Sequence, residues 1–349
     1  MIAGEARLCP GRVPHRACAN GFPMTPPIFL TEDDVRDLVS VRHAINALDG
    51  CFGAPDGDVA VLPRQRAPLP GGPFQVMAAT YAPRVFGLKA YSGAPQGTFY
   101  HVLLYSHAER RLLALIEANL LSQLRTGAAS GLATRHMAPA EAPVLAVIGT
   151  GKQAFWQAAA IASVRDITEI RVHGRDADRR AAFARAVEMQ LGIPTQPVDD
   201  ARRCVEGADI IATITKAREP VCLSHWVKDG AHVNVAGSNA ADRREVDGAL
   251  VTRAALLATD DLAQARIEAA EFRDLAAAGL LDWGTVRPLS DIVRNPPSRA
   301  AGDVTLFKSL GVASEDIALA EVVYARALAA GRGRPIESGR AASFPGGMS

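Results

Sequence analysis

The chain has little of several features that mark whole classes of protein. Of its 349 residues only 5 are cysteine, aromatic residues make up 5%, and the formal net charge is +1. The cysteines are Cys9, Cys18, Cys51, Cys204 and Cys222. They form no CxxC pair and have no histidine at ligand spacing, which argues against a zinc site and a disulfide framework. We therefore expect reduced thiols in a cytoplasmic protein, and no metal.

Long apolar runs and strongly charged segments are also missing. No apolar run approaches the roughly 18 residues of a membrane span. The near-zero net charge gives no field that would attract nucleic acid or an acidic membrane, so neither is expected as a partner. Arg7, Arg12 and Arg16 come with proline and glycine but without the apolar core of a secretory signal. Residues 1–23 are expected to be a disordered extension, with the fold beginning near Met24.

Residues 31–141 predict a helix, an antiparallel sheet and a second helix. Thr31 and Asp34 have the spacing of a capping box, and apolar residues follow at helical spacing as far as Leu48. Five short apolar runs between residues 58 and 118 are separated by Pro-Gly and polar turns, which is typical of antiparallel strands. A long helix is expected over residues 119–138.

From residue 142 the pattern changes to strands that alternate with helices. The apolar runs VLAVIG, EIRVHG, DIIATIT, HVNVAG and ALLATD begin at residues 144, 169, 209, 232 and 255. Buried strands separated by helices predict an α/β fold with a doubly wound parallel sheet. Residues 305–332 predict a strand or turn and then an amphipathic helix, and residues 333–349 a flexible tail.

The first turn of this second region has the pattern G-x-G-x-x-A. Gly149 permits a tight turn, Gly151 lets the backbone approach a pyrophosphate, and Ala154 lets the helix pack closely on the strand. A Walker A motif is excluded because Gln153, not serine or threonine, follows Lys152. We predict a dinucleotide whose phosphates lie on the residues of this turn, which are Gly149, Thr150, Gly151, Lys152, Gln153 and Ala154.

The end of the next strand decides which dinucleotide is favoured. An NAD-specific fold usually has an acidic residue there, which binds both ribose hydroxyls. This chain has Gly174 and Arg175, with Arg179 one turn further. A guanidinium can pair with a 2′-phosphate, so NADP(H) is favoured over NAD(H). The alternative is that Arg175 is solvated and Asp176 binds the ribose.

Arg125 is the most informative basic residue of the first region. It shares a helix face with Leu121, Ala128 and Leu132, and a charge on such a face needs a partner. The partner is either a protein carboxylate, for which Glu117 is a candidate, or the carboxylate of a ligand. Taken singly, the strand residues Lys89, Arg64 and Arg66 are most simply read as solvated.

Four segments together resemble the ornithine cyclodeaminase/μ-crystallin family, from about Met24 to Gly331. They are LRTGAASGLATRHMA, IGTGKQA, VNVAGSNAADRREVD and LFKSLGVASEDIA. The resemblance implies a Rossmann-type domain (142–304) inserted in an α+β substrate-binding and dimerisation domain (24–141 plus 305–332). It also implies a homodimer and a small amino or imino acid as substrate.

The same resemblance assigns the site residues. Arg125 matches the arginine that binds the substrate carboxylate, and Lys89 matches the active-site lysine. A second arginine falls on Arg66 or Arg64, and we assign Arg66. Further contacts to the cofactor are expected from Thr213, Thr215, Gly237, Ser238 and Leu310.

One departure from the family bears on the reaction. Asn239 stands where cyclodeaminases carry an aspartate, and an amide cannot act as a general base near neutral pH. We therefore expect an NAD(P)H-dependent reductase of a 2-imino acid (a ketimine such as Δ1-pyrroline-2-carboxylate), or the reverse dehydrogenase. The alternatives are an ornithine cyclodeaminase and an NADPH-linked binding protein with little catalysis.

Overall fold

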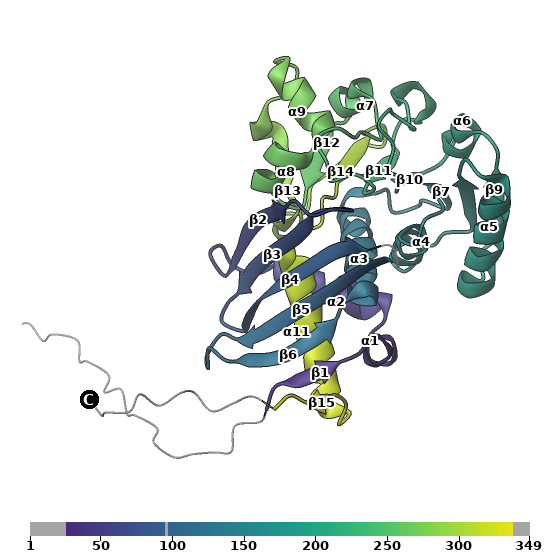
Figure 1. Cartoon of the computed structure of the whole chain (residues 1–349). Coiled ribbons are helices and arrows are strands. Elements are labelled where there is room, and N and C mark those ends of the chain that lie inside the picture. The colour runs from purple at the N-terminus through teal and green to yellow at the C-terminus, as the bar shows by residue number, and fades with distance from the viewer. Residues whose placement is uncertain (1–25, 95–96, 338–349) are drawn as a thin grey trace, which may run out of the picture.

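The computed structural model describes residues 26–94 and 97–337. The extension expected over residues 1–23 and the last residues of the expected tail lie outside this part of the chain. Two sheets, each with its own helices, make up the described residues (Figure 1). None of the described helices is both long and apolar enough to cross a membrane.

The first sheet has seven strands among the described residues, in the order β15-β1-β6-β5-β4-β3-β2. The five strands predicted from short apolar runs form an antiparallel meander, β2 to β6. The strands are β1 (Ile28–Leu30), β2 (Val59–Ala67), β3 (Phe74–Tyr81), β4 (Val85–Ala94), β5 (Gly97–Ser106), β6 (Leu112–Glu117) and β15 (Arg334–Pro335). The last of these pairs with β1 at a point where we expected a flexible tail.

Four helices lie on one face of this sheet. They are α1 (Glu32–Leu38), α2 (Val41–Phe52), α3 (Asn119–Met137) and α11 (Ala313–Ala329). The capping box of Thr31 and Asp34 is present, but the helix predicted through Leu48 is two helices. Ser40 divides them because its extended backbone ends one helix and its hydroxyl caps the next.

The second sheet is parallel and has eight strands among the described residues, in the order β13-β12-β14-β11-β10-β7-β8-β9. They are β7 (Val144–Ile148), β8 (Glu169–His173), β9 (Thr195–Val198), β10 (Ile210–Thr213), β11 (His232–Val235), β12 (Leu256–Thr259), β13 (Val286–Pro288) and β14 (Thr305–Lys308). The predicted doubly wound sheet is confirmed, and β9 and β13 are strands that the apolar pattern did not reveal. The order reverses between β7 and β10, which is where such folds bind ligands.

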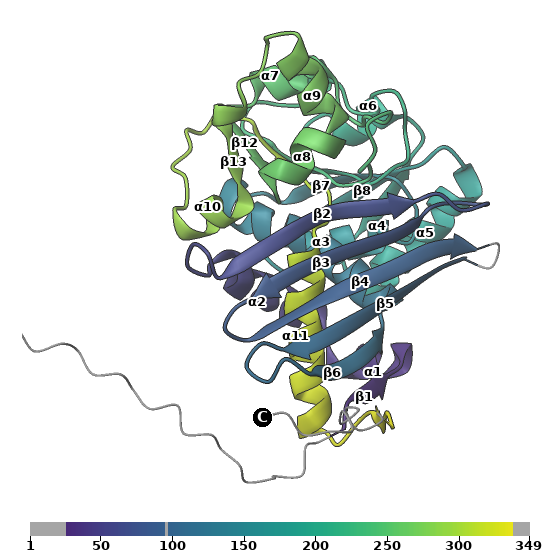
Figure 2. The same cartoon turned by 60° about the vertical axis from the view of Figure 1, so that its left-hand side comes forward.

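Helices cover both faces of the parallel sheet (Figure 2). They are α4 (Ala154–Ala162), α5 (Ala177–Leu191), α6 (Ala201–Val205), α7 (Gly248–Arg253), α8 (Leu262–Glu268), α9 (Ala270–Ala277), α10 (Leu289–Arg294) and the 3-10 helices η1 (Ser224–Trp226) and η2 (Trp283–Thr285). Leu145 and Val147 pack into one core and Ala146 and Ile148 into another. Burial on both faces explains why these strands are continuous apolar runs.

The two sheets meet where α3 packs on α4. A Cβ on Gly127 would lie 2.3 Å from the carbonyl oxygen of Trp156, so glycine is required for this close approach. The chain leaves the parallel sheet later than expected. We placed residues 305–332 with the first sheet, whereas β14 lies between β11 and β12 and only α11 returns to the first sheet.

Candidate active site

The glycine-rich turn after β7 has the geometry that its sequence pattern predicted. Gly149 has a φ of 126°, and a Cβ there would lie 2.4 Å from the carbonyl oxygen of Ile214. No heavy atom lies within 4 Å of a Cβ built on Gly151, so that position is open for a ligand. Gly174 matters as well, because a Cβ there would lie 2.8 Å from Thr150. The turn is therefore pressed against the start of the loops that follow β8 and β10.

The N-terminus of α4 lies directly behind this turn. Gln153 is its N-cap residue but no side chain caps the helix, and the Gln153 Oε1 is buried without a hydrogen-bond partner among the described residues. Ala154 is fully buried, whereas Lys152 is exposed. Uncapped N–H groups at a helix start bind anions, so this geometry fits a pyrophosphate.

The loop after β8 contains the residues that bear on the choice of dinucleotide. Arg175 is exposed, and Asp176 is the N-cap residue of α5, where its Oδ1 accepts a hydrogen bond of 2.9 Å from the backbone N–H of Arg179. One oxygen of the carboxylate that could have bound a ribose is thus used to cap the helix.

Glu245 joins the loops after β10 and β11. Its carboxylate accepts hydrogen bonds from the Thr215 N–H at 2.6 Å and Oγ1 at 2.8 Å, and from the Gly237 N–H at 2.7 Å. Burial raises the pKa of Glu245, although Lys308 and these hydrogen bonds act in the opposite direction. A Cβ on Gly237 would lie 2.1 Å from the Thr215 nitrogen. Sequence reasoning missed Glu245, which stands among charged residues in the segment RREVD.

Two further predicted residues lie at the same strand ends. Thr213 is fully buried at the end of β10, and its Oγ1 has no hydrogen-bond partner among the described residues. Ser238 is buried after β11, with its Oγ 3.4 Å from the carbonyl oxygen of Arg243. The unsatisfied hydroxyl of Thr213 is consistent with a polar ligand at this edge of the sheet.

Lys89 is buried on the inner face of β4, with 1% of its surface exposed. Its Nζ lies 2.7 Å from a carboxylate oxygen of Asp316 and 3.4 Å from the Ser122 Oγ. Burial lowers the pKa of Lys89 to about 7, with Arg125 acting in the same direction and Asp316 against it. The residue that looked like a solvated strand lysine is therefore a buried, titratable amine.

Arg125 is also buried and pairs with two carboxylates of α11. Its Nη1 lies 2.8 Å from Glu315 and its Nε 3.2 Å from Asp316. Glu117, the candidate partner from the sequence, is the last residue of β6 rather than a residue of α3, and it accepts a hydrogen bond from the Glu32 backbone instead. Burial raises the pKa of Glu315 to about 8, although Arg125 opposes the shift.

The second arginine of the cluster is Arg64. It is buried, pairs with Glu268 at 2.6 Å, and donates to the carbonyl oxygens of Leu310 and Gly311 at 3.0 and 2.7 Å. Arg66, which we had assigned, has 35% of its side chain exposed. It pairs with the other carboxylate oxygen of Glu268 and donates to the Asn239 carbonyl oxygen at 3.2 Å. Arg66 therefore lies at the rim, in contact with the backbone of the residue that departs from the family.

The loop after β14 brings the two buried arginines together. Asp260 accepts hydrogen bonds of 2.7 Å from the N–H groups of both Leu310 and Gly311. Gly311 has a φ of 73°, and a Cβ there would lie 2.3 Å from the Arg125 Nη1. Asp260 is a second carboxylate that sequence reasoning missed.

The resulting cluster contains four cationic side chains and three carboxylates that pair with them. Asp260 is a fourth buried carboxylate beside the cluster. The carboxylates Glu315 and Asp316 had a signal in the sequence, because they are adjacent acids in the apolar stretch GVASEDIALA. The described residues contain no group of three or more His, Cys, Asp or Glu that could hold a metal ion.

Known proteins resemble this chain over most of its length. It is 35% identical to a Δ1-pyrroline-2-carboxylate reductase of Bacillus cereus over 228 residues, which are 64% of this chain and 70% of that protein. The structure of Thermococcus litoralis Δ1-pyrroline-2-carboxylate reductase in complex with NADH and L-proline matches with a TM-score of 0.84 and 28% identity. That match covers 88% of this chain and all of the other.

A second solved structure is an archaeal alanine dehydrogenase dimer with bound NAD. It matches with a TM-score of 0.83 and 27% identity, over 89% of this chain and 99% of that chain. A sequence model of the ornithine cyclodeaminase/mu-crystallin family matches residues 26–331, so the resemblance stated from four segments is confirmed over nearly the whole chain. This protein belongs to the ornithine cyclodeaminase/mu-crystallin family.

Proposed function

We propose that this protein is an NAD(P)H-dependent oxidoreductase that reduces a small 2-imino acid, or oxidises the matching amino acid. The observation that carries the proposal is the buried cluster of Lys89, Arg125 and Arg64, beside the loop that follows β14. Relatives that act on pyrroline-2-carboxylate or alanine support it.

The cofactor, when bound, supplies the hydride that goes to the imine carbon. The turn at Gly149 and the uncapped start of α4 would hold its pyrophosphate, and the loops joined by Glu245 would lie against its nicotinamide half. Those loops follow β10 and β11, at the same edge of the sheet as the phosphate turn.

Arg125 and Arg64 would bind the substrate carboxylate by charge-assisted hydrogen bonds. Each already has a carboxylate partner, so the substrate would add to balanced pairs rather than to isolated charges. Bound in this way, the α-carbon would be fixed for hydride transfer, which is the main advantage of a preorganised site. Arg64 replaces Arg66 in this role because only Arg64 is buried in the cluster.

Lys89 would supply the proton that reduction requires on the imine nitrogen. A side chain is an effective general acid when its pKa is close to the working pH, and burial gives Lys89 a pKa of about 7. Asp316 keeps the ammonium paired while it is buried.

The direct test is oxidation of NADPH or NADH by the purified protein with Δ1-pyrroline-2-carboxylate, followed by nicotinamide absorbance and by detection of proline. Rapid oxidation with formation of proline is expected. Ammonia release from ornithine, without net change of cofactor, would instead indicate a cyclodeaminase. Tight binding without turnover over a panel of imino and amino acids would indicate a binding protein.

We also propose that NADP(H) is preferred to NAD(H). The support is local: Arg175 is exposed beside the expected ribose position, and Asp176 is used as a helix cap. A 2′-phosphate would meet the guanidinium of Arg175 there. The two solved relatives contain NADH or NAD. Measuring kcat/KM with NADPH and with NADH therefore tests whether this chain differs from them.

A homodimer through the outer face of the first sheet completes the proposal. On this face a continuous apolar row crosses five strands, made of Leu62, Ala78, Leu88, Leu103 and Leu115. No described element covers it, whereas α11 covers the opposite face (Figures 1 and 2). Uncovered apolar faces of this kind mark protein interfaces. Sedimentation of Leu88→Glu beside Met189→Glu, an exposed residue of α5, tests this, and only the first is expected to give monomers.

A further inference from the structure

A pair of tyrosines lies beyond Lys89 on the inner face of the first sheet. Tyr91 on β4 is directly opposite Tyr100 on β5, and their rings are stacked with centroids 4.7 Å apart and planes 27° apart. The Lys89 Nζ lies 5.5 Å from the centre of the Tyr91 ring and 5.6 Å from that of Tyr100. The two rings therefore border the amine that the proposed function places at the reacting nitrogen.

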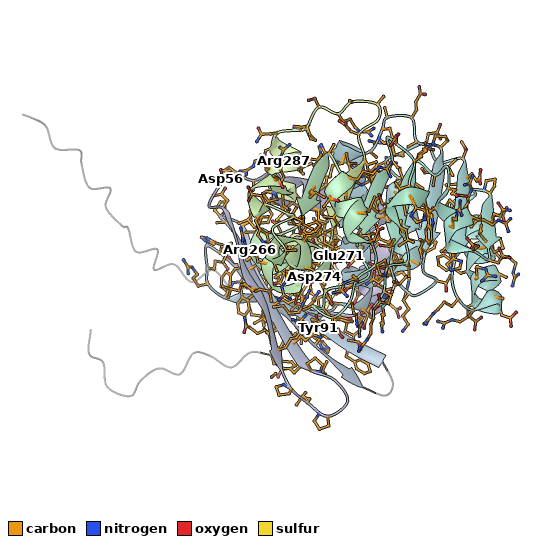
Figure 3. The ribbon with its side chains drawn as sticks, turned by 90° about the horizontal axis from the view of Figure 1, so that it is seen from above. Asp56, Tyr91, Arg266, Glu271, Asp274 and Arg287 are labelled. Carbon is orange, nitrogen blue, oxygen red and sulfur yellow. The ribbon has the colours of Figure 1, made fainter. Side chains whose placement is uncertain are left out.

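Gln75 on β3 extends this surface. It is directly opposite Tyr91, whose hydroxyl donates a hydrogen bond of 2.9 Å to the Gln75 Oε1. We call the three side chains of Gln75, Tyr91 and Tyr100 the tyrosine wall. Figure 3 shows Tyr91 on the strands of the first sheet, apart from Glu271 on α9 in the other layer.

The wall shares its side of the sheet with the charged cluster. Lys89 and Tyr91 are two residues apart on one strand, so their side chains point to the same face. Once the substrate carboxylate is on the arginines and its nitrogen is at Lys89, the remaining substituent of the α-carbon is the side chain. The wall is the adjacent surface on which that side chain can rest.

We propose that the tyrosine wall binds the side chain of the substrate and selects a short apolar one over a cationic one. This inference rests on the proposed function. The wall has aromatic faces and one amide but no carboxylate, and the carboxylates of Glu268, Glu315 and Asp316 are paired with arginine or lysine. A cationic side chain would be repelled by the Lys89 ammonium, which already lies over the same rings and already uses the Asp316 carboxylate.

The stacked rings also limit the length of the side chain. Tyr100 contributes a large, partly buried ring at a position where a smaller residue would leave space next to Tyr91. A site of fixed size discriminates by about tenfold or more for a single methylene. We therefore expect the wild type to prefer a five-membered cyclic imine to a six-membered one.

The first experiment measures kcat/KM for Δ1-pyrroline-2-carboxylate and Δ1-piperideine-2-carboxylate with Tyr100→Ala and Tyr100→Phe. Tyr100→Ala should move the ratio about tenfold towards the larger ring, and Tyr100→Phe should leave it unchanged. Phe99→Ala is the matched control, because Phe99 is the preceding residue, faces the other side and is 52% exposed. Since each ratio comes from one preparation, partial loss of folded protein does not affect it. An unchanged ratio in Tyr100→Ala overturns the assignment.

A second variant tests the rejection of cations. Gln75→Glu adds a carboxylate to the wall and should increase the affinity for ornithine relative to proline by about tenfold, as expected for a new charge-assisted contact. Equal relative affinity in the wild type and Gln75→Glu would also overturn the assignment.

Binding measurements separate this inference from the proposed function. Calorimetry of proline, pipecolate and ornithine, with oxidised cofactor present, needs no turnover. If the wild type reduces neither imine, the proposed function fails. The wall is then still supported if Tyr100→Ala shifts the ratio of proline to pipecolate affinity, and fails if it does not.

Discussion

Lys89 and Asp316 form a buried ion pair although 227 residues of chain separate them, with the lysine Nζ 2.7 Å from the carboxylate. Both side chains have at most 1% of their surface exposed. Arg125 contacts the same aspartate, so a strand of the sheet and two helices meet at one carboxylate. A buried pair of this kind is a weak source of stability, but loss of either partner leaves an uncompensated charge.

Substitution of Lys89 by methionine should remove most of the turnover. The side chain keeps its length but can no longer donate a proton, and a positioned acid contributes about 10²- to 10⁴-fold to the rate. Steady-state kcat on a confirmed imine, with cofactor affinity from fluorescence titration, checks this. Full turnover with unchanged cofactor binding would rule out the role of the lysine.

The pH dependence of imine reduction should follow Lys89. Because the protonated amine is the proposed acid, kcat/KM should fall as the pH rises through about 7. Asp316 raises the pKa of Lys89, so Asp316→Asn should move this fall to lower pH. Glu321→Gln is the control, since Glu321 lies on the same helix but pairs with Arg84. A profile that does not move in Asp316→Asn contradicts the coupling.

Glu315 should make stability depend on pH. Its pKa rises from 4.5 to about 8 on folding, so between these values the folded protein binds more protons than the unfolded chain. The free energy of unfolding contributed by this group therefore falls as pH rises from about 4.5 to about 8. Relative to the wild type, Glu315→Gln should gain stability between pH 5 and pH 8, measured by chemical denaturation. A difference that is constant with pH would show that another group dominates.

Gly311→Ala should impair both stability and substrate binding. Any residue but glycine is strained at its φ of 73°, and the added Cβ would lie 2.3 Å from the Arg125 guanidinium. Gly207→Ala is a matched control, because it has a φ of 77° but no atom within 4 Å of the added Cβ. The control should lose about 1 kcal/mol from backbone strain alone. Gly311→Ala should lose more and also raise KM, and an equal effect of both variants would contradict the steric argument.

Arg175→Ala should reduce the preference for NADPH. Loss of a guanidinium contact to a phosphate is expected to lower kcat/KM with NADPH about tenfold while leaving NADH unaffected, since such bonds contribute roughly 1.5 kcal/mol or more. Arg185→Ala, an exposed arginine further along α5, is the control. If the wild type has a kcat/KM with NADH that equals or exceeds its kcat/KM with NADPH, the proposed preference is wrong.

Local pattern accounts for much of the fold. The short apolar runs from residue 58 are β2 to β6, and the continuous apolar runs from residue 144 are parallel strands. Both could be predicted because the side chains of a strand are apolar on whichever of its faces are buried. β9 and β13 were not predicted because they are the two edge strands of the parallel sheet, where a continuous apolar run is not needed. The position of β14 between β11 and β12 was not predicted either, because pairing between strands far apart in the sequence leaves no local signal.

The sequence by itself determined the tight turn at Gly149 and the helix after it, since these residues are contiguous and their conformations depend on near neighbours. Through resemblance it also led us to predict that Lys89 and Arg125 belong to the site, and both are buried in one cluster. Only the tertiary structure decided that Arg64 and not Arg66 is buried there, and that α11 and α8 supply the paired carboxylates. A bulge in β2 and the packing of α11 on the sheet set these contacts, and long-range packing of this kind has no fixed spacing along the chain.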